Sequence, residues 1–166
     1  MEQITHCISI KEPWASAIVA KLKTIEWRSR KLIARPPQTI AIATSKTGAG
    51  DYLPGGYIVG VARITAVVPW RDEQTFRDRA VIGTGLDYGY AMMIGGFAAC
   101  KPVPVRGNVG IYRVPEGFAP VYAESREELA EWWNAARVWQ DGPKNTSEQI
   151  RAERMQQYGL GWRMDD

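Results

Sequence analysis

The chain has 166 residues, the length of a single domain, and at this size it can bury about 70% of its unfolded surface without disulfides or metals. Its 45% hydrophobic and 23% charged residues exclude wholesale disorder. The net charge of +3 is uneven: residues 1–46 carry eight Lys and Arg against three Asp and Glu, whereas residues 115–166 carry six against ten.

Several classes of protein are disfavoured at the outset. No run of residues reaches the ~18 apolar positions of a membrane span, and the N-terminus lacks the pattern of a signal peptide. A soluble, cytoplasmic protein without a membrane partner is therefore expected. With one histidine, His6, and no Cys-x-x-Cys pair, neither a metal site nor a cofactor is predicted. Cys7 and Cys100 lie in apolar runs and are interpreted as buried core residues, although a disulfide stays open.

The N-terminal third predicts a strand, a short helix and a second strand. Residues 4–10 alternate in part, and Pro13 suits the first turn of a helix. Residues 24–28 read as a strand that places Thr24, Glu26 and Arg28 on one face, beside Lys23.

The middle of the chain predicts more strands. Gly95-Gly96 is interpreted as the turn of a hairpin, and residues 72–80 as a polar helix. The strands are expected over residues 38–45, 57–69, 90–94, 97–103 and 109–114. About six strands with helices at the connections predict an α+β fold built on a small, partly open β-barrel.

The last quarter of the sequence predicts helices instead of strands. Ser125 to Glu128 forms a capping box, and the tryptophans behind it recur at helical spacing, which indicates packing against the barrel. A base-stacking platform is the minority interpretation of these tryptophans. A last helix is expected over residues 147–157. The predicted organisation is a barrel domain over 1–115 and a helical extension over 116–166 packed on it.

Basic residues concentrate between Lys21 and Arg35. This stretch has six of them and a single acidic residue, Glu26. Such a local field attracts phosphates. Equally, the run could be an ordinary solvated face, and the charged residues of the strand a structural ion-pair cluster.

Several short motifs follow one another in an order that resembles the ASCH family, whose members share the PUA-like barrel. They are Ser9-Ile-Lys-Glu-Pro-Trp14, Lys23-Thr-Ile-Glu-Trp-Arg28, Ala43-Thr-Ser-Lys46, Gly56-Tyr-Ile-Val-Gly-Val61 and Pro104-Val-Arg-Gly-Asn-Val-Gly-Ile-Tyr112. The resemblance covers about residues 4–115. It implies a PUA-like mixed barrel with a cleft lined by the helix and the Lys-Thr-x-Glu-x-Arg strand.

The family has been linked to binding of RNA or DNA, to RNA cleavage and to hydrolysis of acylated cytidine. Its hydrolase members resemble this chain at Lys23 but have a threonine, their candidate nucleophile, where this chain has Glu26. The amidohydrolase activity therefore ranks low, with Thr24 retained as a tentative catalytic candidate. Many relatives also have tryptophan where this chain has Tyr112, and often another near Met92.

The first hypothesis is a basic cleft that binds a nucleotide, RNA or single-stranded DNA. Arg28 could clamp a phosphate or a base edge, and Trp14 could stack on a base, although a core role for it is favoured. The candidate binding residues are Trp14, Lys23, Arg28, Arg30, Ser45 and Lys46.

Two alternatives remain. The first is a metal-independent hydrolase of RNA or of a modified nucleoside, with Lys23 and Glu26 as acid–base pair. The second is a homodimer or a protein partner held through the acidic, tryptophan-rich C-terminal helices.

Overall fold

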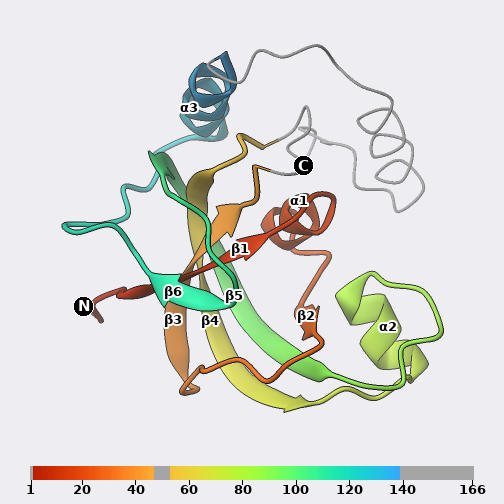
Figure 1. Ribbon diagram of the computed structural model, residues 1–166. Helices are drawn as coiled ribbons and strands as arrows, with labels where there is room; N and C mark the ends of the chain where they lie inside the picture. Colours follow the sequence, from red (N-terminus) through yellow and green to blue (C-terminus); the bar gives the residue numbers. More distant parts are fainter. Residues whose placement is uncertain (1, 47–52, 139–166) are drawn as a thin grey trace.

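The computed structural model describes residues 2–46 and 53–138 (Figure 1). The elements in chain order are β1 (His6–Ile10), α1 (Trp14–Val19), β2 (Ile25–Arg28), β3 (Gln38–Thr44), β4 (Tyr57–Pro69), α2 (Gln74–Ala80), β5 (Tyr90–Pro104), β6 (Ile111–Arg113) and α3 (Arg126–Val138). The predicted α+β class is confirmed. The helix expected over residues 147–157 lies outside the described residues.

The strands form one mixed six-stranded sheet in the order β2-β5-β4-β3-β1-β6. β1 pairs parallel with β3 and antiparallel with β6, and all other pairs are antiparallel. The sheet curls into a half-barrel (Figure 1). The curl brings β2, at one edge, near β1 at the other side, so that Arg28 Nη2 donates to the Ser9 carbonyl oxygen at 2.9 Å.

The predicted hairpin at Gly95-Gly96 is wrong, because β5 runs without a break from Tyr90 to Pro104. The pairing with β4 shifts on both sides of Ile64, leaving Gly95 as an extra residue on β5 and Thr65 as one on β4. A Cβ on Gly95 would lie 2.6 Å from the Thr65 methyl group. Glycine at this position therefore allows a β-bulge, which bends the strand. The sequence had suggested a turn here.

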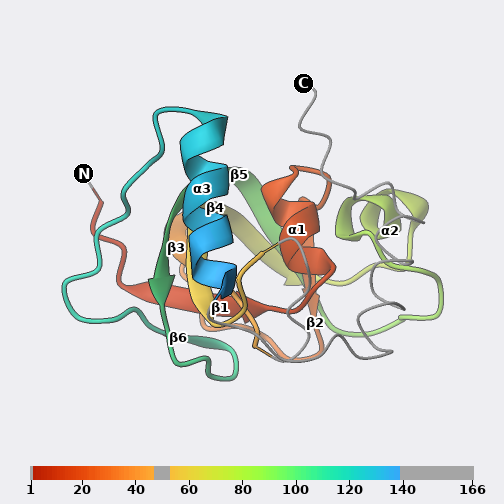
Figure 2. The ribbon, with the colours of Figure 1, turned by 90° about the horizontal axis from the view of Figure 1, so that it is seen from above.

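Helices α1 and α3 lie on the same face of the sheet (Figure 2). The main core joins them to the strands, with Ile18 of α1 and Trp133 of α3 buried against Ile8 and Ile40. The tryptophan face of α3 thus packs in part as the sequence predicts, whereas Trp132 lies against Lys101, whose Nζ is 5.5 Å from the ring centre.

The predicted capping box at the start of α3 is present with one difference. The Glu128 N–H donates to Ser125 Oγ at 3.1 Å, as expected. The Glu128 carboxylate accepts from the N–H of Glu124 at 2.8 Å, one residue before the cap. Both contacts satisfy amides near the start of the helix that would otherwise lack partners.

Both cysteines are free and fully buried, as the interpretation of them as core residues predicts. Burial raises the pKa of Cys100 from 9.0 to about 12. The folded protein therefore holds this proton between about pH 9 and pH 12, while the unfolded chain releases it. The contribution of Cys100 to stability is complete below pH 9 and is lost as the pH rises through that range.

We therefore expect the free energy of unfolding to fall more steeply above pH 9 in the wild type than in Cys100→Ala. The difference in slope should approach 1.4 kcal/mol per pH unit, about the free energy of one pKa unit. Denaturant unfolding at about pH 8 and about pH 10 measures it. Parallel pH profiles for the two proteins would contradict the assignment.

Within residues 2–46 and 53–138, no helix has both the length and the apolar character needed to cross a membrane.

Candidate nucleotide-binding cleft

A cavity of about 640 Å³ opens where the two sides of the half-barrel approach each other. Its walls come from the end of β1, the start of α1, β2, the residue after β3 and the loops that follow α2 and precede β6 (Figure 1). It is lined by Ser9, Ile10, Lys11, Trp14, Lys23, Glu26, Trp27, Arg28, Ser29, Ser45, Ile82, Leu86, Asn108 and Val109.

Lys23 reaches the cavity because of the turn that follows α1. Lys21 has a left-handed backbone with φ 60°, and the N–H groups of Leu22 and Lys23 both donate to the Ala17 carbonyl oxygen. This turn places the Lys23 side chain inside the protein, where the residue is only 2% exposed. A buried ammonium requires polar partners, and here Glu26 and the Ala80 carbonyl oxygen supply them.

Three charged side chains form the floor of the cavity. Lys23 Nζ lies 3.2 Å from Glu26 Oε2 and donates to the Ala80 carbonyl oxygen at 2.6 Å. Arg28 Nε lies 3.0 Å from Glu26 Oε1 as an ion pair. Glu26 therefore sits between two cations, and Lys23 also satisfies a carbonyl in the last turn of α2.

Burial lowers the pKa of Lys23 from 10.5, because desolvation penalises the ammonium form. The nearby carboxylate of Glu26 opposes this shift, and the positive charge of Arg28 adds to it. Lys23 thus gives up its proton more readily than an exposed lysine does.

Two half-buried tryptophans form walls of the cavity, each held by its indole N–H. Trp14 Nε1 donates to the Val81 carbonyl oxygen at 3.3 Å, and Trp27 Nε1 to that of Tyr88 at 2.9 Å. The rings of Trp27 and Tyr88 meet edge to face at 5.6 Å. Trp14 also packs against the main core, as the favoured interpretation of it predicts.

Helix α1, which carries Trp14, is short, and its first turn is capped by the side chain of a residue that precedes it. The buried carboxylate of Glu12 accepts hydrogen bonds from the Ser16 N–H at 3.1 Å and the Ser16 hydroxyl at 2.9 Å. The carboxylate thereby satisfies an amide in the first turn of α1. This cap fixes the start of the helix at the cavity wall.

Of the residues singled out from the sequence, the structure brings together Trp14, Lys23, Glu26, Arg28 and Ser45 at the cavity. Three others do not line it. Thr24 precedes β2, and its hydroxyl accepts from Arg79 Nε at 3.0 Å. Arg30 is exposed on the loop between β2 and β3, and the side chain of Lys46 lies across Gly56.

The sequence reasoning gave no role to other residues of the lining, among them Ser9, Lys11 and Asn108. All three fall inside motifs that carry the family resemblance. Position within a motif was therefore the available signal, but nothing in their chemistry distinguished them from neighbouring loop residues.

No protein-family model and no curated protein matches the chain. Solved structures similar to it include the ASCH protein of Zymomonas mobilis, at 16% identity and a TM-score of 0.48, covering 78% of this chain and 93% of that one. Two point variants of that protein, each at 18% identity, have TM-scores of 0.48 and 0.47. Each covers 67% of this chain, and 90% and 88% of its own length respectively. The family named for these three structures, the ASCH family, is also the family that the sequence motifs resemble.

Proposed function

We propose that the cavity binds one nucleotide, either free or as an unpaired residue of RNA or single-stranded DNA. The observation that carries this proposal is that positive charges and two indole rings line the same cavity. The lining includes three cations, Lys11, Lys23 and Arg28, one carboxylate, Glu26, and two indole rings. Pockets of about 300–1,000 Å³ hold ligands of nucleotide size, and a base can stack on an indole while cations hold its phosphate.

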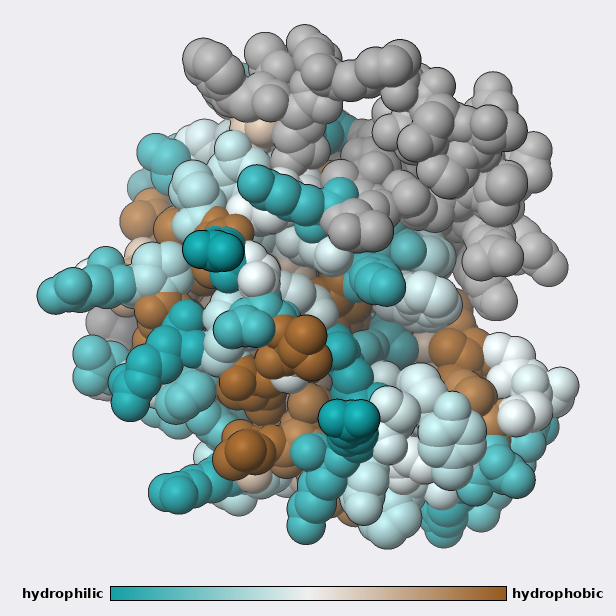
Figure 3. Space-filling model, in the orientation of Figure 1, coloured by the Kyte–Doolittle hydropathy of each residue, from teal (hydrophilic) through white to brown (hydrophobic). Residues whose placement is uncertain are grey.

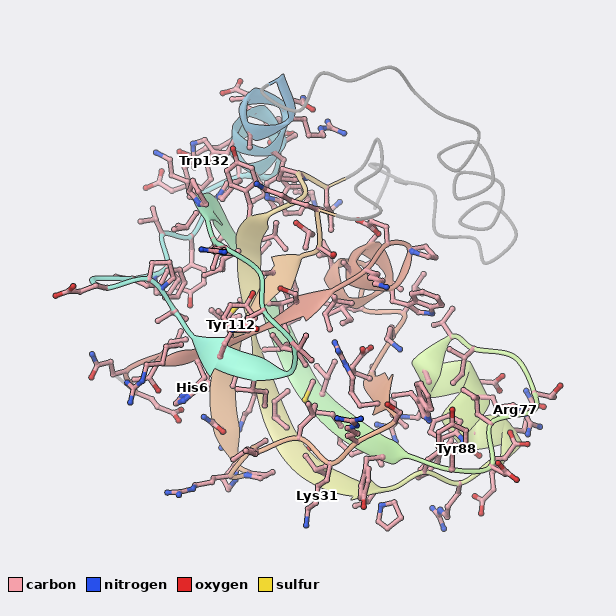
Figure 4. The ribbon with its side chains drawn as sticks, viewed as in Figure 1. His6, Lys31, Arg77, Tyr88, Tyr112 and Trp132 are labelled. Atoms are coloured by element: carbon pink, nitrogen blue, oxygen red, sulfur yellow. The ribbon has the colours of Figure 1, made fainter. Side chains whose placement is uncertain are left out.

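The surroundings of the cavity support a strand rather than a free nucleotide alone. The loop between β2 and β3 leaves the cavity at Ser29 and carries three exposed cations, Arg30, Lys31 and Arg35. Lys31 projects away from the sheet (Figure 4). The face shown in Figure 3 is mainly hydrophilic with separate apolar patches. A phosphate backbone could follow the loop while one base enters the cavity.

Arg28 provides the direct test, because it is the only guanidinium among the lining residues of the described chain. We expect Arg28→Met to weaken binding of a labelled single-stranded RNA about tenfold or more, the value of a charge-assisted hydrogen bond. Arg79→Met is the matched control, since Arg79 lies on α2 and does not line the cavity.

Fluorescence anisotropy with single-stranded RNA, single-stranded DNA and duplex DNA, at about 50 mM and about 200 mM salt, measures the effect. Equal loss in both arginine variants would show that charge alone, and not the cavity, holds the strand. Absence of any complex at micromolar protein would contradict the proposal.

A second candidate is metal-independent hydrolysis of RNA or of a modified nucleoside, which rests on one observation. Lys23, with its lowered pKa, lies 3.2 Å from Glu26, a separation suited to an acid–base pair. Incubation of RNA or acylated cytidine with the protein in chelator tests it, with Glu26→Gln as the inactive comparison. A substrate left intact at high protein concentration would contradict hydrolysis and leave binding as the activity.

A further inference from the structure

A chain of hydroxyl and thiol groups runs from the sheet interior to the cavity wall. Cys7 and Ser9 lie on the same face of β1, because they are two residues apart on a strand. Tyr112, labelled on β6 in Figure 4, pairs directly opposite Cys7. The Tyr112 hydroxyl lies 2.5 Å from Ser9 Oγ and 3.6 Å from Cys7 Sγ. Of the three residues, only Ser9 lines the cavity.

Each group of this chain keeps its proton at neutral pH, so each can donate one hydrogen bond. Burial raises the pKa of Cys7 to about 11 and raises that of Tyr112 further above neutrality. Both groups are therefore protonated at neutral pH. The Cys7 thiol can donate to the Ile8 carbonyl oxygen or to the Tyr112 oxygen, and in the second arrangement the single phenolic proton is donated to Ser9. When Ser9 Oγ accepts that proton, its own O–H is left to point elsewhere.

Ser9 lines the cavity, and its neighbours on two sides are known. Its backbone is fixed, because the Ser9 carbonyl accepts from Arg28. Gly107 approaches from the loop before β6, and a Cβ there would lie 3.4 Å from Ser9 Oγ. With glycine at this position, residue 107 adds no side chain next to the hydroxyl.

We propose that Ser9 is a ligand-binding residue of the cavity, which donates its hydroxyl proton to an acceptor oxygen of the bound nucleotide, and that Tyr112 is the residue that orients it. The inference rests on the proposed function and adds to it a named polar contact. The acceptor is either a carbonyl oxygen of the base or a phosphate oxygen, since both accept from a serine hydroxyl in the same way.

A double-mutant cycle on Ser9→Ala and Tyr112→Phe tests this arrangement with labelled single-stranded RNA as the probe. We expect Ser9→Ala to weaken binding about tenfold, the loss of one hydrogen bond, and Tyr112→Phe to weaken it about threefold. The double variant should bind like Ser9→Ala alone, because a residue that acts through Ser9 has no effect once the hydroxyl is gone. Ser9→Thr, which keeps a hydroxyl, should restore most of the affinity.

Repeating the titration with uridine and with uridine 5′-monophosphate separates the two acceptors. A Ser9→Ala loss with both probes assigns the contact to the base or sugar, and a loss with the monophosphate alone assigns it to the phosphate. Binding by Ser9→Ala within twofold of the wild type would overturn the inference while the proposed function stands. A Tyr112→Phe loss that persists in the Ser9→Ala background would overturn the orienting role, and failure of the wild type to bind any probe would overturn both proposals.

Discussion

Replacing Glu26 with glutamine should lower the free energy of unfolding by about 3 kcal/mol at neutral pH, because it leaves a buried lysine without its counter-charge. Lys23 is 2% exposed, and Glu26 is the only carboxylate that ion-pairs with it in the described part of the chain. The glutamine keeps the shape and one acceptor, which places the expected loss at the lower end of the range for a broken buried pair.

The loss should also depend on pH in a defined direction. Glu26 raises the pKa of Lys23, so its removal lowers that pKa further below the unfolded value of 10.5. Between the two values the unfolded chain binds the additional proton, and stability therefore rises with pH. The difference between wild type and Glu26→Gln should shrink as the pH approaches 10.5.

The double variant Lys23→Met/Glu26→Gln provides the control for this stability prediction. With Lys23 and Glu26 both replaced, no unpaired buried lysine remains, and only Arg28, whose side chain is 27% exposed, lacks its carboxylate partner. We therefore expect the double variant to recover at least half of the lost free energy. The Ala80 carbonyl, which accepts from Lys23, limits the recovery. Chemical denaturation of the four proteins measures the cycle. A Glu26→Gln variant as stable as the wild type would show that Lys23 does not need the carboxylate.

Removing the three cations of the loop between β2 and β3 should produce the largest change in binding. We expect the triple variant Arg30→Ser/Lys31→Ser/Arg35→Ser to bind single-stranded RNA about a hundredfold more weakly at about 0.1 M salt. The slope of log K against log salt should fall by about 2, since each phosphate contact on a single strand contributes about 0.7. The three side chains are exposed, so the fold should be unaffected.

The matched control removes the same charge elsewhere. Lys101, Arg113 and Arg126 are also exposed, on β5, β6 and α3, and none of them lines the cavity. Lys101 packs against Trp132, which lies at the opposite end of the molecule from Lys31 (Figure 4). We expect their triple serine variant to keep most of the affinity. Equal effects of the two triple variants would mean that the protein binds through its overall charge.

The arrangement of the cleft could be predicted in part, because strand periodicity is a local signal. Alternation along residues 24–28 predicted that Glu26 and Arg28 share a face, and both line the cavity. The depth of Lys23 could not be predicted, because it depends on the turn at Lys21 and on the end of α2, more than fifty residues further along the chain. A basic run in sequence therefore divides into a buried ion-pair cluster and an exposed loop.

The strands were predicted less well where glycine occurs inside them. Gly60 lies inside β4, and the pairing of β4 with β5 shifts between Ile58 and Gly60. Gly95-Gly96 was interpreted as a turn, but β5 stays paired with β4 on both sides of the two glycines. Glycine permits either conformation, and long-range pairing decides between them.

The most direct test of the proposed cleft is photocrosslinking of a single-stranded RNA that contains 4-thiouridine, followed by mapping of the modified peptides. If the cavity receives the base, the crosslinks should fall on its walls, at Trp14, Trp27 and the Asn108–Val109 loop. Their yield should fall about tenfold or more in Arg28→Met, in line with the weaker binding, and persist in Arg79→Met. Crosslinks on Trp132 of α3 with none on the cavity walls would contradict the account and establish the helix face as the binding surface.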